Sequence, residues 1–325
     1  MVSLMGLIQS APVQELATSG AKCCWCGDPL FRAKQGGTWG PWGCFRPPCF
    51  ARQMAWSMTT TKGKSGEIDK WLFCPVPKQV EFFEATRRAQ RVLYGGPAGP
   101  GKSHGLRWGL YRDALRIPNL NCLLLRRTFK ELDQTHLRDM SREVEPVLGG
   151  RYLSGDKVAK FPNGSVIQAG HCESEVDAMQ YLSTEYDRIV FDELVTFPMG
   201  VALEIMSRAR TSKEAVIAAG GAQVWAGSNP GGRGALWVKS FFIDKVVDPE
   251  QFPNYNPAGY AYVHASFDDN PYMDPRYRQT LEELPPVRRR QLLYGDWAAF
   301  DGQFFDWLAM KDGQPWHVAD MGITA

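Results

Sequence analysis

The chain has 325 residues with an apolar fraction of 44%, so we expect one packed α/β core of roughly 200 to 250 residues with smaller appendages. Its net charge of +2 excludes a protein-wide positive field, and any contact with nucleic acid has to come from local basic patches. It contains no run of about 18 apolar residues and no basic segment before its apolar opening, which predicts a soluble intracellular protein without a membrane partner.

Four cysteines cluster after an N-terminal arm, which we assign to 1–21. They are Cys23, Cys26, Cys44 and Cys49. Two close pairs around a short hairpin-like stretch are typical of a tetrahedral Zn²⁺ site, although the second pair is more widely spaced than usual. We predict a zinc-binding module at 22–50, which the metal would stabilise because about 30 residues bury little apolar surface. The alternative is a set of free thiols in an arm. The polar stretch at 51–69 is predicted to be a linker.

A glycine-rich segment then follows a short apolar run and precedes a stretch with helical periodicity. In GGPAGPGKS, the positions Gly96, Gly101, Lys102 and Ser103 match G-x-x-x-x-G-K-S/T, the phosphate-binding loop called Walker A. Such a loop closes backbone N–H groups around an anion at a helix N-terminus. We expect Lys102 to reach the β- and γ-phosphates of ATP and Ser103 to hold Mg²⁺. The same nucleotide would be lined by Gly96, Gly99 and Gly101. The alternative is a turn that only connects a strand to a helix.

Three later apolar runs read as buried strands that end in polar residues. Their final polar residues are Arg126 and Arg127, Asp192 and Glu193, and Ser228 and Asn229. Such runs, alternating with helical stretches, are typical of a parallel sheet with crossover helices. Ligands of open α/β sheets bind at the carboxyl ends of the strands, so we expect these polar residues to face the glycine-rich loop.

The acidic pair predicts the second half of an ATP site. Asp192 ends an apolar strand, as a Walker B carboxylate that orients Mg²⁺ does. Its neighbour Glu193 can polarise the attacking water as a general base. The two motifs together predict a Mg²⁺-dependent ATPase. An exposed acidic pair at a strand end is the alternative.

Taken in order, these segments resemble the large terminase subunit of tailed bacteriophages, the ATPase that drives viral DNA into a preformed capsid. The resemblance covers roughly 70–310. It includes PVPKQVEFFEA, the Walker A loop, LLLRRTFKEL, a hairpin before DRIVFDEL, AGSNPGG, and the long segment from FDDNP to GQFF. It implies that Gln79 faces the adenine, with Phe82 or Phe83 nearby. It also implies that Ser228 and Asn229 sense the γ-phosphate.

The resemblance also implies a fold and a domain order. The fold is that of an ASCE-type P-loop NTPase, with a mainly parallel sheet flanked by helices, here preceded by a module similar to a zinc ribbon. We assign the ATPase core to 70–240, a lid or linker subdomain to 241–310, and the start of a truncated nuclease domain or a tail to 311–325. Family members carry a nuclease that uses several carboxylates. Only Asp320 resembles one of them here, so we expect no nuclease activity.

The partners implied by the resemblance are double-stranded DNA, the capsid portal protein and the small terminase subunit. The chain would form a ring on the portal, and it would lie in the host cytoplasm, docked transiently on a procapsid. Candidates for an arginine supplied to a neighbouring subunit are Arg126, Arg127, Arg208 and Arg210. Candidates for gripping DNA are Arg32, Lys34, Arg46, Lys239 and Arg288 to Arg290. Two alternatives are a helicase-like P-loop ATPase and a non-catalytic, zinc-mediated DNA-binding scaffold.

Overall fold

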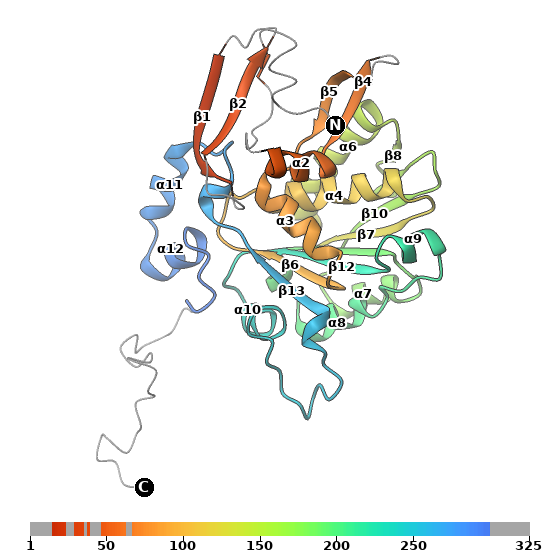
Figure 1. Cartoon of the computed structure of the whole chain (residues 1–325). Coiled ribbons are helices and arrows are strands. Elements are labelled where there is room, and N and C mark those ends of the chain that lie inside the picture. Colours follow the sequence, from red (N-terminus) through yellow and green to blue (C-terminus); the bar gives the residue numbers. More distant parts are fainter. Residues whose placement is uncertain (1–14, 24–28, 36–37, 40–46, 63–66, 300–325) are drawn as a thin grey trace, which may run out of the picture.

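The computed structural model describes residues 15–23, 29–35, 38–39, 47–62 and 67–299, which include a central eight-stranded sheet (Figure 1). In spatial order its strands are β13 (Tyr260–His264), β6 (Arg91–Gly95), β12 (Gln223–Ser228), β11 (Arg188–Asp192), β7 (Asn121–Arg126), β10 (Val166–His171), β9 (Val158–Lys160) and β8 (Arg151–Leu153). The first six pair in parallel, and β10, β9 and β8 pair antiparallel at one edge. The predicted α/β fold with a mainly parallel sheet is therefore confirmed.

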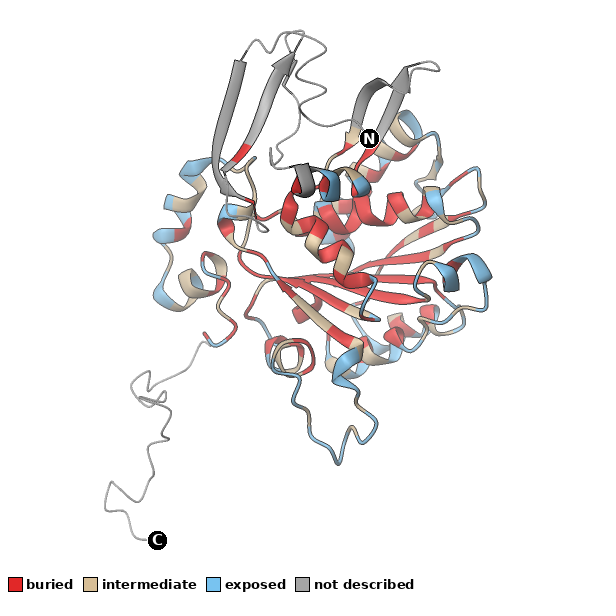
Figure 2. Ribbon diagram, viewed as in Figure 1, coloured by how far each residue is buried: buried red, intermediate tan, exposed pale blue. Residues whose placement is uncertain are grey.

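Helices cover both faces of this sheet (Figures 1 and 2). One face packs against α3 (Pro77–Thr86), α4 (Lys102–Arg116) and α6 (Arg138–Leu148). The other face packs against α7 (Glu175–Leu182), α8 (Met199–Met206), α10 (Ala235–Val238) and the π-helical turn η4 (Lys239–Asp244). Strands β11 and β12 are buried along their whole length, as expected for parallel strands with helices on both sides.

Helix α4 shows how the sequence pattern produces this packing. Leu106, Leu110 and Ala114 recur every four residues, and all three are fully buried against the sheet. Burying each leucine contributes roughly 1.5 to 3 kcal/mol relative to leaving it exposed. The helix starts after Gly101, whose φ of +79° is a left-handed conformation that favours glycine. The apolar face of α4 thus fixes where the loop before it lies on the sheet.

The stretch predicted to be a linker, 51–69, is structured wherever the structure describes it. It holds most of α2 (Pro47–Trp56), strand β4 (Met58–Lys62) and the start of β5 (Glu67–Phe73), which pairs antiparallel with β4. Trp56 stacks on Phe83 of α3 with ring centroids 5.1 Å apart, and Met58 is buried in the same apolar cluster. These large apolar side chains attach the segment to the core, which its polar composition did not suggest.

The region of the predicted zinc module is only partly described. Strands β1 (Glu15–Lys22), β2 (Pro29–Gln35) and β3 (Thr38–Trp39) form an antiparallel sheet, and β1 includes the end of the predicted arm. Cys23 and Cys49 are buried, whereas Cys26 and Cys44 lie outside the described residues. The zinc site therefore stays a prediction.

Beyond residue 240 the chain returns to the same sheet before it forms a small helical lobe. Strand β13 pairs with β6, so the central sheet extends past the predicted core range of 70–240. Helices α11 (Pro275–Glu282) and α12 (Pro286–Leu292) share a separate cluster built on Phe267, Leu281 and Leu293. The range 300–325, with Asp320, lies outside the described residues. Within the described part of the chain, no helix has the length and apolarity to cross a membrane.

Candidate active site

The carboxyl ends of four neighbouring strands bring the predicted site residues together. Gly95 at the end of β6 pairs with Ser228 of β12, and Asp192 at the end of β11 pairs with Gly227. The phosphate loop, the acidic pair and the polar end of β12 are therefore adjacent, although they are far apart in the sequence. Arg126 joins them from the end of β7. This is the edge of the sheet at which the sequence predicted a ligand site.

The backbone of the loop at Gly96 accepts only glycine. Its φ is +145°, and a Cβ atom at this position would collide with the carbonyl oxygen of Ala265. Ala265 is held in place because its N–H donates to the carbonyl of Gly95 at 2.7 Å. Gly96 N–H in turn donates to the carbonyl of Ser228 at 3.2 Å. The start of the loop is thus clamped between β12 and the residue after β13.

Lys102 is buried, and three neutral oxygens surround its ammonium group. Nζ donates to the carbonyls of Pro97 at 2.5 Å and Gly96 at 3.3 Å, and to Oδ1 of Asn229 at 2.6 Å. Burial lowers the pKa of Lys102 to about 8, and the charges of Glu193 and Asp192 offset part of this effect. Among the described residues, the lysine therefore has no direct anionic partner. The phosphates of a nucleotide would supply one.

Asp192 is buried and fully engaged by hydrogen bonds. Its Oδ1 accepts from Ser103 Oγ at 2.9 Å, and its Oδ2 lies 3.0 Å from Arg126 Nε and 2.9 Å from His136 Nε2. Burial alone would raise the pKa of this carboxyl group, but His136, Arg126 and Ser103 outweigh burial and lower it. Asp192 is thus held ionised beside the Ser103 hydroxyl. Oxygen ligands of this kind suit Mg²⁺, so both residues fit the predicted metal role.

Glu193 has a strained backbone. Its φ and ψ are +61° and +58°, a left-handed conformation that is uncommon for a residue with a Cβ atom. Its carboxylate receives only long hydrogen bonds from Asn229, at 3.4 Å from N and 3.5 Å from Nδ2. Burial and the adjacent charge of Asp192 raise the pKa of Glu193. A carboxylate with a raised pKa is a stronger base as long as it stays ionised.

Gln79 contacts the phosphate loop directly. Its Oε1 accepts from Val76 N at 3.0 Å, and its Nε2 donates to the carbonyl of Gly101 at 2.9 Å. The amide therefore ties the start of α3 to the loop. Phe82 and Phe83, one of which is expected near an adenine, are both buried in the core. The amphipathic pattern of α3 turns these rings toward the sheet, where Phe82 stacks on Tyr94 of β6.

The sequence analysis missed His136, which the structure places against Asp192. This histidine lies in the π-helical turn η2 (Asp133–Leu137), between α5 (Phe129–Leu132) and α6. Such turns are frequent at functional sites. The side chain is fully buried, and its Nδ1 has no hydrogen-bond partner among the described residues, so the tautomer that fits carries hydrogen on Nε2. A single histidine in an amphipathic stretch carries no sequence signal for this contact.

The candidate arginines differ in what they contact. Arg126 binds Asp192 of its own chain, and Arg127 donates to the carbonyl of Cys172 at 2.5 Å. Arg210 pairs with Glu185 at 2.9 Å, and each side chain is 56% exposed. Arg208 donates to the carbonyl of Leu182 at 3.2 Å. Of the four arginines, Arg126 contacts the candidate active site of its own chain, and Arg210 is the most exposed.

The chain is similar to known proteins in sequence and in fold. The family described as "Terminase large subunit, T4likevirus-type, N-terminal" matches residues 93–311, more than half of the chain. No curated protein matches the sequence.

Three solved structures illustrate the shared fold. The large terminase of a thermophilic bacteriophage, in complex with ADP, has a TM-score of 0.54 at 16% identity, covering 69% of this chain and 54% of that chain. The HK97 bacteriophage large terminase has a TM-score of 0.52 at 12% identity, covering 76% and 55%. A mutant ATPase domain of the Thermus phage P74-26 large terminase has a TM-score of 0.50 at 17% identity, covering 69% and 94%. This chain thus spans about half the length of the first two of these proteins.

Proposed function

This chain belongs to the family of large terminase subunits, and from that premise we propose that it is an ATP-hydrolysing motor that moves double-stranded DNA into a procapsid. The observation that carries the proposal is the contact between the two halves of the predicted ATP site. Ser103 Oγ lies 2.9 Å from Asp192 Oδ1, so the end of the phosphate loop meets the end of the acidic strand. An incidental glycine-rich turn would not require this contact.

Hydrolysis in such a site depends on positioning and charge neutralisation. Lys102 would offset charge on the β- and γ-phosphates. When bound, Mg²⁺ neutralises charge on the same oxygens, and Ser103 and Asp192 are the residues that would hold it. Glu193 would orient the attacking water and accept its proton. The left-handed backbone of Glu193 departs from the strand conformation, and its carboxylate lies against Asn229, which also binds Lys102.

Asn229 connects the phosphate-binding lysine to the general base. Its Oδ1 accepts from Lys102, while its N and Nδ2 donate to the Glu193 carboxylate. A γ-phosphate that draws the Lys102 ammonium toward itself would weaken the hydrogen bond to Asn229. Asn229 could then turn toward the phosphate and reposition Glu193. This coupling supports the sensor role proposed for Asn229. The Ser228 hydroxyl donates to the Asn229 carbonyl and so holds the backbone of that residue.

The partners proposed for this motor are those of a terminase: double-stranded DNA, the portal protein and the small terminase subunit, with the chain assembled as a ring. Two of the candidate DNA-binding residues already have anionic partners, because Lys239 pairs with Asp244 at 2.5 Å and Arg290 with Asp296 at 2.7 Å. Arg288 and Arg289 have no ion pair within the described residues. They are the better candidates for contacting a DNA backbone.

The decisive test measures ATP hydrolysis and DNA uptake with procapsids that carry a portal, using the full-length protein. We expect ATP turnover that requires Mg²⁺ and DNA that becomes protected from added nuclease. Hydrolysis without any DNA uptake would favour a different P-loop ATPase. The helicase alternative gains no support from the described residues, in which parallel strands occur in one sheet.

A further inference from the structure

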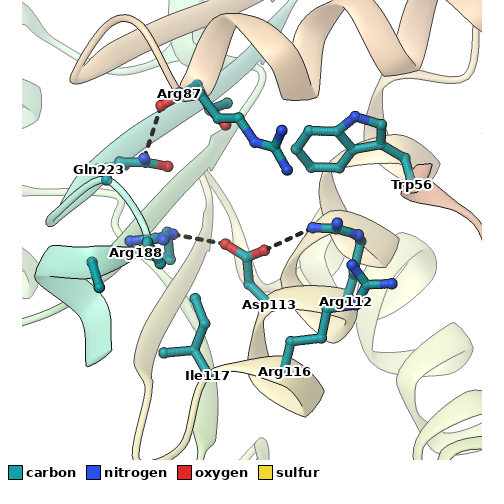
Figure 3. A pocket seen from close by; sticks show the side chains of 12 residues that line it. Trp56, Arg87, Arg112, Asp113, Arg116, Ile117, Arg188 and Gln223 are labelled. Carbon is teal, nitrogen blue, oxygen red and sulfur yellow. Dashed lines mark hydrogen bonds and ion pairs between the residues drawn. The ribbon is translucent and has the colours of Figure 1, made fainter. Parts of the chain in front are cut away.

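A pocket of about 480 Å³ lies at the edge of the sheet opposite the candidate active site (Figure 3). It is lined by the last turn of α4, by Arg188 and Gln223 at the starts of β11 and β12, by Trp56 of α2, and by the end of α3. Helix α4 has 15 residues and spans about 22 Å at 1.5 Å per residue. The pocket and the phosphate loop therefore occupy opposite ends of one helix and are separate sites.

The lining of the pocket has a large excess of positive charge. Four of its twelve residues are arginines and one is acidic: Arg87, Arg112, Arg116, Arg188 and Asp113. The single carboxylate is shared, because Arg188 Nε donates to it at 3.0 Å and Arg112 Nη1 lies 3.5 Å away. The exposed residues Arg87 and Arg116 have no ion pair within the described part of the chain. Four cations against one anion leave a net excess of three positive charges in the lining.

Arg112 is a buried arginine of this lining with one donor that is unsatisfied within the described residues. Its side chain is buried, and its Nε has no hydrogen-bond partner among the residues that the structure describes. Its guanidinium lies 4.0 Å from the centroid of the Trp56 ring, and that of Arg87 lies 4.4 Å from the same centroid. Burial lowers the pKa of Arg112 to about 10, and the nearby charge of Arg116 adds to the effect. A buried guanidinium without a full set of acceptors is costly, so an added anion would be strongly favoured.

We propose that this pocket binds a small phosphorylated anion, such as pyrophosphate or the phosphate chain of a nucleotide. Arginine forks match the geometry of phosphate oxygens, and two or more of them can hold one phosphate group. The volume lies within the usual range for small-molecule sites. A concave pocket with its charge partly buried suits a compact anion better than it suits the broad backbone of a DNA duplex. The proposal does not depend on ATP hydrolysis by the chain.

Calorimetric titration of inorganic pyrophosphate into the full chain tests this proposal. The titration uses Lys102→Ala, so that the phosphate loop contributes little, after circular dichroism has shown that this variant is folded. We expect one binding event, weakened about tenfold or more by Arg87→Gln with Arg116→Gln, because both removed groups would contact the anion. Both arginines are exposed, and thermal unfolding checks that losing the Arg87–Trp56 contact leaves the fold intact. If Lys102→Ala fails to fold, the double substitution is made in the unaltered chain, where it should weaken one of two binding events about tenfold or more.

The matched control is Arg88→Gln with Arg142→Gln, which removes the same charge from two exposed positions outside the pocket. We expect less than a twofold change in pyrophosphate affinity. An equal loss in both double variants would mean a general electrostatic effect and would overturn the proposal. The absence of pyrophosphate binding would overturn it too. If instead only the affinity for a short DNA duplex falls with the pocket substitutions, the pocket is a DNA contact and not a small-anion site.

Discussion

The two ends of helix α4 differ in how buried charge is compensated. At the first turn, Ser103, Asp192, His136 and Arg126 form a network in which the buried carboxylate has three partners. At the last turn, two buried arginines share Asp113, and two exposed arginines add further charge. At the first end, hydrogen bonds hold the Asp192 carboxylate in a fixed geometry. At the second end, the main feature is an excess of positive charge. Substitutions at the first end should therefore affect chemistry far more than substitutions of similar size at the second.

The largest expected effect follows removal of the lysine at the first end. Lys102→Ala should reduce ATP turnover by about 10³-fold or more, because the charge that offsets the phosphates is lost. Steady-state phosphate release measures the effect, and circular dichroism checks the fold. Lys130→Ala is the matched control, since Lys130 is exposed and distant from the loop in sequence. Substantial residual turnover in a folded Lys102→Ala protein would refute the phosphate-loop assignment.

The second prediction separates chemistry from binding at the same end of α4. Glu193→Gln keeps the shape of the side chain but removes the base, so hydrolysis should fall about 10²- to 10⁴-fold. Affinity for ATP with Mg²⁺ should stay within a few-fold of the original, because Lys102 and Ser103 are untouched. Calorimetry and single-turnover kinetics measure the two quantities. A variant that hydrolyses at the original rate would show that Glu193 is not the base.

The third prediction concerns His136, which holds Asp192 in place. His136→Ala should lower ATP turnover about 10- to 100-fold and raise the Mg²⁺ concentration needed for half-maximal activity, by analogy with residues that orient metal ligands. His136→Gln can still donate a hydrogen bond to Asp192, so it should recover part of both losses. A purely structural role predicts instead that thermal stability falls while the Mg²⁺ requirement stays unchanged.

The smallest expected effect is a pH dependence of nucleotide affinity. It should arise at the first end of α4, where the buried cation is a lysine and not an arginine. The pKa of Lys102 is lowered to about 8, so the nucleotide-free protein loses this charge as pH rises through that value. Affinity for a non-hydrolysable ATP analogue should then fall between pH 7 and 9, by up to about tenfold per unit above the pKa. In Lys102→Arg the guanidinium stays protonated, so the affinity should be much less dependent on pH. A flat profile in the unaltered chain would contradict the lowered pKa.

Much of the candidate site could be predicted from the sequence because it is encoded locally. The glycines of the phosphate loop satisfy a backbone requirement within nine residues, and the buried strands are recognisable as apolar runs that stop at polar residues. The rule that ligands bind at the carboxyl ends of parallel strands then brought Asp192, Glu193, Ser228 and Asn229 to one edge. The structure agrees with the sequence prediction at this edge, because the local pattern and the strand direction are enough to place these residues.

Other features depended on contacts between distant segments, which no local pattern specifies. His136 reaches Asp192 from a π-helical turn, and Trp56 of α2 stacks on Phe83 of α3. The arginine pocket likewise forms where Asp113 and Arg188, 75 positions apart, meet. The sequence by itself determined the fold class and the backbone pattern of the proposed phosphate loop, because strand periodicity and glycine backbone freedom are local properties. Only the tertiary structure decided which buried charges have partners, because each partner comes from a different element of the fold.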